Sequence, residues 1–410
     1  MFPRKSVLAI LLLTTLLIFG AQVSACGGDD DDDVARTSSD DDDVVPPVDD
    51  DDDDDADDDD DDDDSDDDDD DADGDFHMSL STSHLLEFRV ADAEYSRGSD
   101  RIIAVSSEPK NRLFLVNGDS GGAESVTLPY SSTDVSVSPN GAYAAVSHGD
   151  NISYVDLADE SIEESFKPST TIGDVILADS YIYGIPIVGD WVHLICLKIS
   201  DKTETEHTGE AMELLRYKSR GRLHPNGDWI YTADTDETPS DFEKYDIVAG
   251  TAAYVDDSPY HGEYPICGDV WFDPDGERIF TKCGRTFTSS GDPDKDMTYA
   301  GLLDTYDDND ETTTQLAFSP TKDTLYALEE IGFVAGNKKT WVKAYNSATL
   351  AYLGKQQLPS VEVDNTDYDL DGRFIFVDNG GTTLYVIAQV EEEAGLTGND
   401  YRLLVYDIQP

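Results

Sequence analysis

The sequence has few cationic side chains, few histidines and no long hydrophobic run. Its 410 residues contain 27 Lys and Arg against 90 Asp and Glu, which gives a formal net charge of −63 at pH 7. Phosphate backbones and anionic lipid headgroups repel such an acidic chain, so nucleic acid and an anionic membrane surface are disfavoured as partners. The charge suits a saline exterior or a cationic partner, and it carries no information about the fold.

An uncharged apolar run near the N-terminus is too short to span a bilayer. Arg4 and Lys5 precede this run, residues 7–19 form it, and small residues follow up to Ala25. This order of segments is typical of a secretory signal peptide, which is removed from the mature protein. We therefore expect residues 1–25 to direct export and to take no part in the fold.

A single cysteine marks the end of this segment. The sequence Val-Ser-Ala-Cys, which ends at Cys26, resembles the lipobox of bacterial lipoproteins. The resemblance implies that the chain is cut before Cys26, that its sulfur is acylated, and that several acyl chains such as palmitate give durable anchoring. Gly27 follows, and in Gram-negative lipoproteins the absence of an aspartate at this place points to the outer membrane. The alternative is an ordinary cut after Ala25 that leaves a free thiol.

Residues 29–75 form an aspartate run that has nothing to bury. They contain 32 Asp and one Arg and so carry −31, which leaves −34 for residues 76–410 once the +2 of Arg4 and Lys5 is included. Like charges repel along such a segment, so we expect residues 26–75 to be a lipidated, disordered stalk with a stretched reach of about 160 Å. The alternative is a calcium- or mineral-binding tail, although the run lacks the rigid loop of a tight calcium site. Its position directly behind the cysteine also resembles the surface-export signals of some lipoproteins.

From about residue 76 the composition becomes that of a globular β protein, and one unit recurs seven times. Each unit has an apolar strand, a tight turn, a second strand that ends in a polar loop, and a strand that often ends in Tyr-Asp. The strands are short, β-branched and aromatic, and no amphipathic helical stretch of useful length separates them. We place the turns at SEPKN 107–111, SPNG 138–141, LADS 177–180, HPNG 224–227, DPDG 273–276, SPTKD 319–323 and DLDG 369–372, with second strands from RLFLV to RFIFV directly after them.

Seven units of about 48 residues match the length of one β-propeller blade, and seven similar units are unusual for a sandwich. The repeats resemble the YVTN and WD40-like seven-bladed β-propeller families, with SPNGAYAAVSHGDNISYVDL, residues 138–157, as the clearest copy. The resemblance covers the chain beyond residue 80, and it implies the fold but not the function, because propellers include binders and enzymes alike. We expect HLLEFRV, residues 84–90, to close the ring as the outer strand of the last blade.

Three further cysteines lie in the expected propeller. The midpoint between Cys267 and Cys283 is residue 275, inside the DPDG turn, so in a hairpin they would face each other on neighbouring strands. Export to an oxidising compartment permits a bond, and we predict a disulfide between them. A metal pair is the alternative, but no neighbouring His or Cys completes a zinc set. Cys196 lies in a strand-like run, and we expect it to be a buried free thiol.

The stretch GDSGG, residues 118–122, matches the nucleophile motif of chymotrypsin-like proteases, with Ser120 in place of the serine. Those enzymes need an upstream His and Asp in a barrel of their own. Here only His77 and His84 precede the motif in the mature chain, and the position is that of a hairpin loop. We therefore predict a loop and no protease.

Two charged stretches have competing interpretations. DYDLDG, with Asp367, Asp369 and Asp371, resembles the start of a calcium loop. Ile375 lies where calcium loops of integrin-type propellers have an aspartate, and the motif coincides with an expected turn, so we favour a turn and predict no cofactor. RYKSRGR, residues 216–222, is a local basic patch that we interpret as a solvated edge.

Loops after second strands and loops before first strands open on one face of a propeller, which is the usual ligand face. Long loops gather on this face in the later blades, and SPYHGEYP, residues 258–265, places two tyrosines and a histidine near the presumed axis. The alternative is a set of polar loop residues without a ligand. Our candidates for a ligand site on this face are His148, Tyr260, His261, Tyr264 and Arg285.

The sequence therefore predicts an outer-membrane lipoprotein whose all-β, seven-bladed propeller, residues 76–410, binds a protein or a glycan without catalysis. The main alternative is a propeller lyase or hydrolase acting on an extracellular polymer, which would gather acid–base groups or a metal at the axis. A third alternative is an envelope scaffold. We expect a monomer that contacts the membrane through its lipid anchor only, and the side of the membrane it faces is left open.

Overall fold

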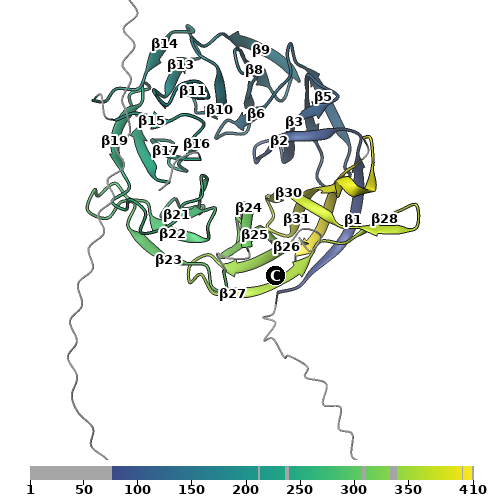
Figure 1. The fold of residues 1–410 in the computed structure, drawn as a ribbon. Helices are drawn as coiled ribbons and strands as arrows, with labels where there is room; N and C mark the ends of the chain where they lie inside the picture. The colour runs from purple at the N-terminus through teal and green to yellow at the C-terminus, as the bar shows by residue number, and fades with distance from the viewer. Residues whose placement is uncertain are drawn as a thin grey trace, which may run out of the picture. The chain divides into compact units, whose positions relative to one another are not determined.

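The computed structural model describes residues 76–410 except 211–212, 236–239, 307–310, 333–338, 399 and 409–410. Over these residues the chain forms seven four-stranded antiparallel sheets, or blades, around a central axis (Figure 1). This arrangement confirms the predicted all-β, seven-bladed propeller. The predicted signal peptide, Cys26 and the aspartate stalk lie outside the described residues.

Blades 1 to 4 follow one another along the chain, each from its inner to its outer strand. Blade 1 contains β2 (Arg89–Ser96), β3 (Arg101–Glu108), β4 (Arg112–Val116) and β5 (Ala123–Thr127). Blade 2 contains β6 (Asp134–Val137), β7 (Tyr143–Ser147), β8 (Ile152–Asp156) and β9 (Ser161–Phe166). Blade 3 contains β10 (Ile172–Leu177), β11 (Tyr181–Pro186), β13 (Ile195–Lys198) and β14 (Glu204–Glu206), and a separate ribbon pairs β12 (Trp191–Val192) with β15 (Leu215–Arg216). Blade 4 contains β16 (Arg220–Leu223), β17 (Trp229–Ala233), β18 (Phe242–Asp246) and β19 (Ala253–Asp257).

Blades 5 to 7 complete the ring. Blade 5 contains β20 (Val270–Phe272), β21 (Arg278–Thr281), β22 (Arg285–Thr288) and β23 (Tyr299–Leu302). Blade 6 contains β24 (Glu311–Phe318), β25 (Thr324–Ile331), β26 (Lys339–Asn346) and β27 (Tyr352–Gln357). A ribbon of β28 (Val361–Val363) and β29 (Thr366–Tyr368) follows, and a short 3-10 turn, Glu392–Ala394, lies in the last blade. Blade 7 contains β30 (Leu370–Val377), β31 (Thr383–Val390), β32 (Tyr401–Ile408) and β1 (Met78–Leu86).

The N-terminal strand closes the ring as predicted, although its bounds differ from the prediction. β1 pairs antiparallel with β32 and supplies the outer strand of blade 7 (Figure 1), which covers an edge that would otherwise be open. The predicted strand, residues 84–90, instead spans the end of β1 and the start of β2. The chain bends between them at residues 87–88, where the Phe88 ring stacks on Phe114 of blade 1 at 3.8 Å between centroids.

Five of the seven predicted turns join the first and second strands of a blade, and two are wrong. SEPKN, residues 107–111, lies between β3 and β4, because blade 1 makes its first turn at residues 97–100. DLDG, residues 369–372, runs into β30, and blade 7 turns at residues 378–382. RLFLV is therefore a third strand and RFIFV belongs to a first strand. Both are as apolar as a second strand, so local composition alone could not separate them.

Apolar side chains fill the spaces between neighbouring blades. Ile103 and Val105 of β3 pack in one cluster with Val135 of β6 and Val146 of β7, which joins blades 1 and 2. Ile102, on the other face of β3, packs toward blade 7. Both faces of the strand are buried, which explains why it is a continuous apolar run without alternation.

Cys196 lies fully buried in β13, which confirms the predicted buried free thiol. Burial raises the pKa of this thiol to about 11, so it stays protonated and unreactive at neutral pH.

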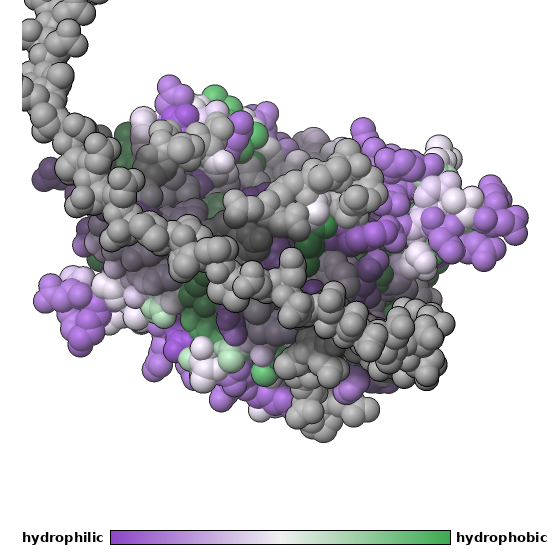
Figure 2. Space-filling view, turned by 60° about the horizontal axis from the view of Figure 1, so that its bottom comes forward, coloured by the Kyte–Doolittle hydropathy of each residue, from purple (hydrophilic) through white to green (hydrophobic). Residues whose placement is uncertain are grey.

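The surface of the described residues is mainly hydrophilic in the view of Figure 2, with hydrophobic side chains confined to smaller areas between polar projections. The most exposed large apolar side chains include Val188 and Trp191, which are 61% and 52% exposed at the β12–β15 ribbon. Within the described part of the chain, none of the helical segments has the length and hydrophobicity needed to cross a bilayer.

Candidate functional site

The first strands of all seven blades surround a cavity of about 710 Å³ on the propeller axis. The wall is charged, although the spaces between the blades are apolar. We use the name channel carboxylates for Asp92, Glu94, Asp134, Asp174 and Asp269, which all line this cavity. The other members of the wall that matter for its chemistry are Ser136 from β6, Arg220 and Arg222 from β16, Trp271 from β20, Lys282 after β21, Gln315 from β24 and Arg373 from β30.

The channel carboxylates solve a hydrogen-bonding problem of the propeller fold. Each first strand is the edge of its sheet, so the main-chain N–H groups that face the axis have no partner strand. The Asp92 carboxylate accepts the N–H of Val135 in the next blade at 2.8 Å. In the same way Asp134 accepts the N–H of Val175 at 2.7 Å, and Asp174 accepts that of Gly221 at 2.9 Å. Each acid thereby ties its own blade to the following one.

A second row of side chains, two residues further along β2 and β6, repeats this arrangement. Glu94 accepts the N–H of Val137 at 2.7 Å, and the Ser136 hydroxyl accepts that of Leu177 at 3.1 Å. Gln315 of blade 6 does the same for Ile375 of blade 7 at 2.7 Å. Asp269 accepts the N–H of its own neighbour, Val270, at 2.9 Å. All five channel carboxylates therefore accept a main-chain hydrogen bond.

Two arginines of blade 4 neutralise most of these acids. Arg220 Nη1 lies 3.0 Å from Asp134 and 2.8 Å from Asp174, so one guanidinium bridges the first strands of blades 2, 3 and 4. Arg222 forms a two-pronged pair with Asp269 through Nε at 3.3 Å and Nη2 at 3.1 Å, and its Nη1 lies 3.7 Å from Glu94 of blade 1. Planar, two-pronged pairs of this type fix position as well as charge.

Burial changes the titration of these groups. Burial raises the pKa of Glu94 to about 7, although Arg222 opposes the shift. Burial and the neighbouring Asp174 raise the pKa of Asp134 well above its usual value, and burial also raises the pKa of Asp174. Asp174 in turn holds the pKa of Arg220 above its usual value, so the arginine stays charged. The net negative charge of the wall is therefore smaller than a count of its carboxylates suggests.

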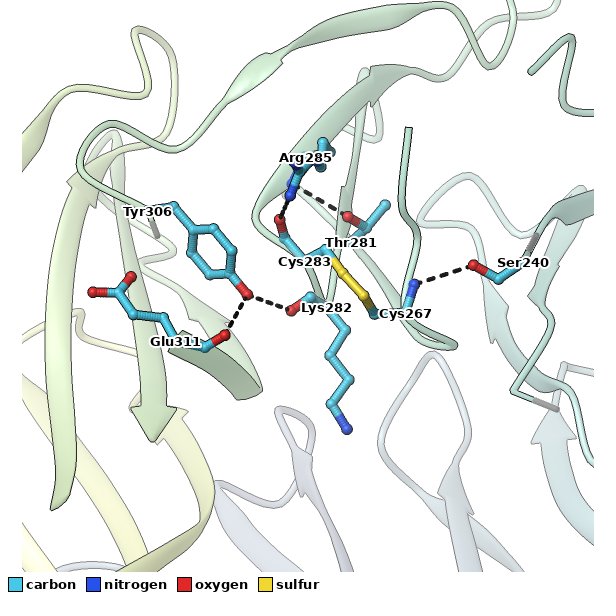
Figure 3. The surroundings of a disulfide bond; sticks show 8 residues. All are labelled: Ser240, Cys267, Thr281, Lys282, Cys283, Arg285, Tyr306 and Glu311. Carbon is cyan, nitrogen blue, oxygen red and sulfur yellow. Dashed lines mark hydrogen bonds between the residues drawn. A yellow bond between two sulfur atoms is a disulfide. The ribbon is translucent and has the colours of Figure 1, made fainter. Parts of the chain in front are cut away.

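The predicted disulfide between Cys267 and Cys283 is confirmed, and it lies at this cavity (Figure 3). The two Cα atoms are 5.6 Å apart. The cysteines flank the β20–β21 hairpin and lie just beyond its three paired positions, so the bond closes the open end of a short hairpin. Cys267 lines the cavity, and Cys283 follows Lys282 directly.

The turn that carries Lys282 is held at several points. The Lys282 N–H donates to the carbonyl of Asp269 at 3.1 Å, and its own carbonyl accepts the hydroxyl of Tyr306 at 3.3 Å. The Gly284 N–H closes the turn on the carbonyl of Thr281 at 3.0 Å. The Lys282 side chain lines the cavity, and Figure 3 shows it extending away from the disulfide.

The structure places the tyrosines that we expected near the axis between blades 4 and 5 instead. Tyr264 stacks on Tyr299 at 4.0 Å between ring centroids, and the Tyr260 hydroxyl accepts the N–H of Tyr299 at 3.1 Å. Both rings pack on the apolar cluster that contains Phe287. Neither lines the channel cavity, because burial of aromatic surface at the outer strands draws them away from the axis.

His261 belongs to a small group of possible metal ligands on the surface. Its Nδ1 lies 2.9 Å from Asp241, and the ligand atoms of Asp241, Asp257 and His261 all lie within 4.8 Å of one another. The hydrogen bond that His261 donates to the Asp241 carboxylate raises the pKa of His261, whose side chain is 66% exposed. The donor types suit a divalent cation, but the group lies away from the channel cavity.

The other two ligand-face candidates make local contacts. His148 Nδ1 donates to the carbonyl of Ser131 at 3.2 Å, its Nε2 accepts the Ser153 hydroxyl at 2.9 Å, and burial lowers its pKa. Arg285 Nη1 donates to the carbonyl of Cys283 at 2.8 Å (Figure 3), which supports the turn beside the cavity. Neither side chain lines the cavity.

Asp367 lies in β29, Asp371 lies in β30, and Asp369 connects the two strands. Asp369 forms an ion pair with Lys339, and Asp371 lies 3.8 Å from Arg373. Asp367 pairs across the β28–β29 ribbon with Glu362. The motif is therefore part of strand structure, and the calcium interpretation stays untested.

The GDSGG stretch forms the loop between β4 and β5. The Ser120 hydroxyl donates to Asn117 at 2.7 Å, and His84 donates from Nε2 to the carbonyl of Asp119 at 2.9 Å. The Asp119 carboxylate accepts the hydroxyl of Tyr385 in blade 7 at 2.8 Å. The motif thus serves as a contact between the first and last blades.

Sequence reasoning missed the channel residues, although a signal was present. The dipeptide Asp-Val recurs at or near the start of a first strand in DVSV, DVIL and DVWF, at residues 134, 174 and 269. A repeated acid at this place marks the innermost strand of a blade, where a carboxylate can accept a main-chain N–H of the next blade. The basic stretch RYKSRGR was interpreted as a solvated edge, but Arg220 and Arg222 point to the channel and pair with its acids.

Comparisons with known proteins agree with the fold and go no further. No protein-family model matches the chain, and no curated protein matches it significantly. Among solved structures 1370 chains are similar, so the architecture is too widespread to indicate a function. One of them is the β-propeller domain of Cps50 (Swd1) from Myceliophteria thermophila, with a TM-score of 0.57, 11% identity, and coverage of 81% of this chain and 100% of that one. At this identity the similarity shows the propeller fold alone.

Proposed function

We propose that the protein is an exported lipoprotein, anchored in the outer membrane through an acylated Cys26, whose propeller binds a protein or a glycan without catalysing a reaction. In this proposal residues 27–75 form a charged stalk that holds the propeller away from the membrane. The order of charged, apolar and small residues before Cys26 supports the anchor.

The observation that carries the binding role is the construction of the channel wall. Every channel carboxylate accepts a main-chain N–H, and in four of the five that N–H comes from the next blade. A general acid or base must exchange its proton with a substrate, which conflicts with a carboxylate that also joins two blades. Polar groups fixed on a rigid ring fit recognition better than proton transfer.

The anchor is tested by expressing the full chain in a Gram-negative host supplied with an alkyne analogue of palmitate. We expect the wild type to incorporate the label, Cys26→Ser to lose it, and Cys196→Ser, which changes a buried thiol of the propeller, to retain it. Labelling of Cys26→Ser would contradict the anchor. Protease treatment of intact cells then gives the side of the membrane, because only a surface-exposed propeller is released.

The binding role is tested by screening the released propeller on arrays of glycans and envelope proteins. A reproducible partner that is recovered chemically unchanged supports the proposal. Turnover of an extracellular polymer by the same preparation would contradict it and favour the propeller enzyme. Full protection from protease in intact cells would replace the surface role with one in envelope assembly.

A further inference from the structure

Every channel carboxylate already has a hydrogen-bond partner. All five channel carboxylates accept main-chain N–H groups, and four of them also lie within ion-pair distance of an arginine. A ligand that offers only donors would therefore compete with bonds that join the blades. A ligand that offers acceptors meets no such competition.

Three donors of the wall have capacity left for a ligand, and Lys282 is the first of them. Its side chain lines the cavity, and among the described residues its ammonium has neither a hydrogen bond nor an ion pair. Lys282 is the only lysine among the described residues that line the cavity. The turn around it is fixed, because its N–H and C=O are both bonded to neighbouring segments and its neighbour Cys283 is in the disulfide.

Two further donors lie in the same wall. Trp271 is only 8% exposed, and its indole Nε1 is buried without a partner in the described structure. An unpaired buried donor costs about 1–3 kcal/mol, so a ligand acceptor placed there would be stabilising. Arg220 uses only Nη1 for its two aspartates, and its side chain remains 47% exposed. Its other nitrogens are therefore open to a ligand.

We propose that the channel is a binding site for a small molecule or chain end that carries an anionic oxygen group, a carboxylate or a phosphate, with the Lys282 ammonium as the main anchor and Trp271 and Arg220 as further donors. The proposal deepens the binding role proposed above and rests on it. The proposal rests on three donors that line one cavity. They are the Lys282 ammonium without a partner, the buried indole N–H of Trp271 and the open edge of the Arg220 guanidinium.

The charge of the cavity agrees with this ligand class. Four cations, Arg220, Arg222, Lys282 and Arg373, lie among the five carboxylates. Burial raises the pKa of Glu94 to about 7 and also raises the pKa of Asp134 and Asp174, so protons remove part of the negative charge at a higher pH than they would for exposed acids. The acidic outer surface repels an approaching anion, but at physiological ionic strength this repulsion is screened over roughly 8 Å. Contacts inside the channel then decide affinity.

The position of the Lys282 side chain depends on the neighbouring disulfide. The β20–β21 hairpin has only three paired positions, and the Cys267–Cys283 bond closes it beside the lysine. Without the bond the turn at residues 281–284 gains freedom, and the ammonium must be ordered again at each binding event. We therefore expect reduction of the disulfide to weaken binding without removing any donor.

Calorimetric titration of the full mature chain in detergent tests the site with three probes: D-glucuronate, D-glucose and inorganic phosphate. We expect glucuronate or phosphate to bind and glucose, which is close to glucuronate in shape but lacks the charge, to bind far more weakly. Lys282→Gln should weaken the charged probe by about tenfold or more, because it removes a charge-assisted bond. Lys167→Gln, at an exposed lysine away from the cavity, is the matched control and should leave affinity unchanged.

Trp271→Phe keeps an aromatic side chain but removes the indole N–H, so it should weaken the same probe by about threefold. Binding of glucuronate alone assigns a carboxylate ligand, and binding of phosphate alone assigns a phosphate. Equal affinity of the wild type and Lys282→Gln, or no binding of either anion, would overturn the proposal. An array partner that binds Lys282→Gln as well as the wild type would overturn this inference and leave the broader binding role intact.

Discussion

The channel and the interior of blade 4 both bury carboxyl groups, but only those of the channel lie beside arginines. In the channel Arg220 lies within 3.0 Å of both Asp134 and Asp174. In blade 4 the buried Glu243 of β18 accepts a hydrogen bond from the Thr232 hydroxyl. The described charged groups that act on its pKa are carboxylates, and all of them raise it.

This difference shows that burial and ion pairing have separate effects on an acid. Burial raises the pKa of Glu243 well above its usual value, and no described cation opposes the shift. Glu243 therefore stays protonated to a higher pH than an exposed glutamate. In the channel burial also raises the pKa of Glu94, Asp134 and Asp174, but there the arginines oppose the shift and offset part of the free-energy cost of burying the carboxylate charge. The two regions should therefore respond differently to the loss of a cation and to pH.

The largest expected effect comes from removing the bridging arginine, which would make the channel resemble blade 4. Arg220→Met leaves Asp134 and Asp174 without their cation and should lower the free energy of unfolding by about 2–3 kcal/mol, toward the lower end for buried pairs because Arg220 is 47% exposed. Urea unfolding followed by tryptophan fluorescence measures this change.

A surface pair supplies the control for that experiment. Arg101→Met breaks the ion pair with Glu124, whose side chain is 54% exposed, and should change stability by less than about 0.5 kcal/mol. Asp174→Asn in the Arg220→Met background should recover part of the loss. Equal effects of the two arginine variants would show that the channel pairs contribute no more than surface pairs.

The disulfide should contribute almost as much as the bridging arginine. The double variant Cys267→Ser, Cys283→Ser frees a loop with a sequence separation of 16 residues and should lower stability by about 2–3 kcal/mol. Unfolding curves with and without reductant measure the effect. The double variant should be insensitive to reductant, and a wild type that is equally insensitive would argue against the bond.

A smaller effect separates the acceptor role of a channel acid from its charge. Asp92→Ala leaves the N–H of Val135 without its acceptor and should lower stability by about 1–2 kcal/mol. Asp92→Asn retains an acceptor oxygen and should cost less than about 1 kcal/mol. If both variants lost the same stability, charge and not the blade-to-blade hydrogen bond would be the reason for this aspartate.

The smallest expected effect is a pH dependence of the folding stability, caused by Glu94 in the channel. Glu94 has a pKa raised from 4.5 to about 7 in the folded state, so the folded chain binds its proton more tightly than the unfolded chain. Its contribution to stability is complete below about pH 4.5 and is lost as the pH rises to about 7.

Glu94→Gln removes this loss. The variant should be more stable than the wild type by about 1 kcal/mol at pH 8, less than the full shift implies because the side chain is 29% exposed, and the gap should close at pH 4.5. Glu243→Gln should act in the same direction without an arginine to oppose it. Unfolding at the two pH values tests this, and a less stable Glu94→Gln at pH 8 would contradict the assignment.

Prediction from the sequence succeeded where the information is local. The turns SPNG, HPNG and DPDG contain residues that favour tight turns, and neighbouring apolar runs reveal the strands they join. The symmetric placement of Cys267 and Cys283 about DPDG was enough to predict their bond. The same local patterns failed at SEPKN and DLDG, where a third strand and a first strand are as apolar as a second strand.

The candidate site was missed because its residues come from seven separate strands. Tyr260 and Tyr264 occupy a loop type that often faces a ligand, but aromatic surface is more stable when buried, and the rings pack beside Phe287. Arg220 lies in a basic stretch that has no sign of burial in the sequence. Only the closed ring brings it to Asp134, 86 residues earlier in the chain.

The sequence by itself determined the repeat, the number of blades, the strand that closes the ring and the disulfide, because turn chemistry and strand periodicity act between near neighbours. The tertiary structure decided what lies at the axis. An edge strand leaves main-chain N–H groups open, and which acid meets them, which arginine neutralises that acid and which lysine stays unpaired depend on distances between blades that no local pattern contains.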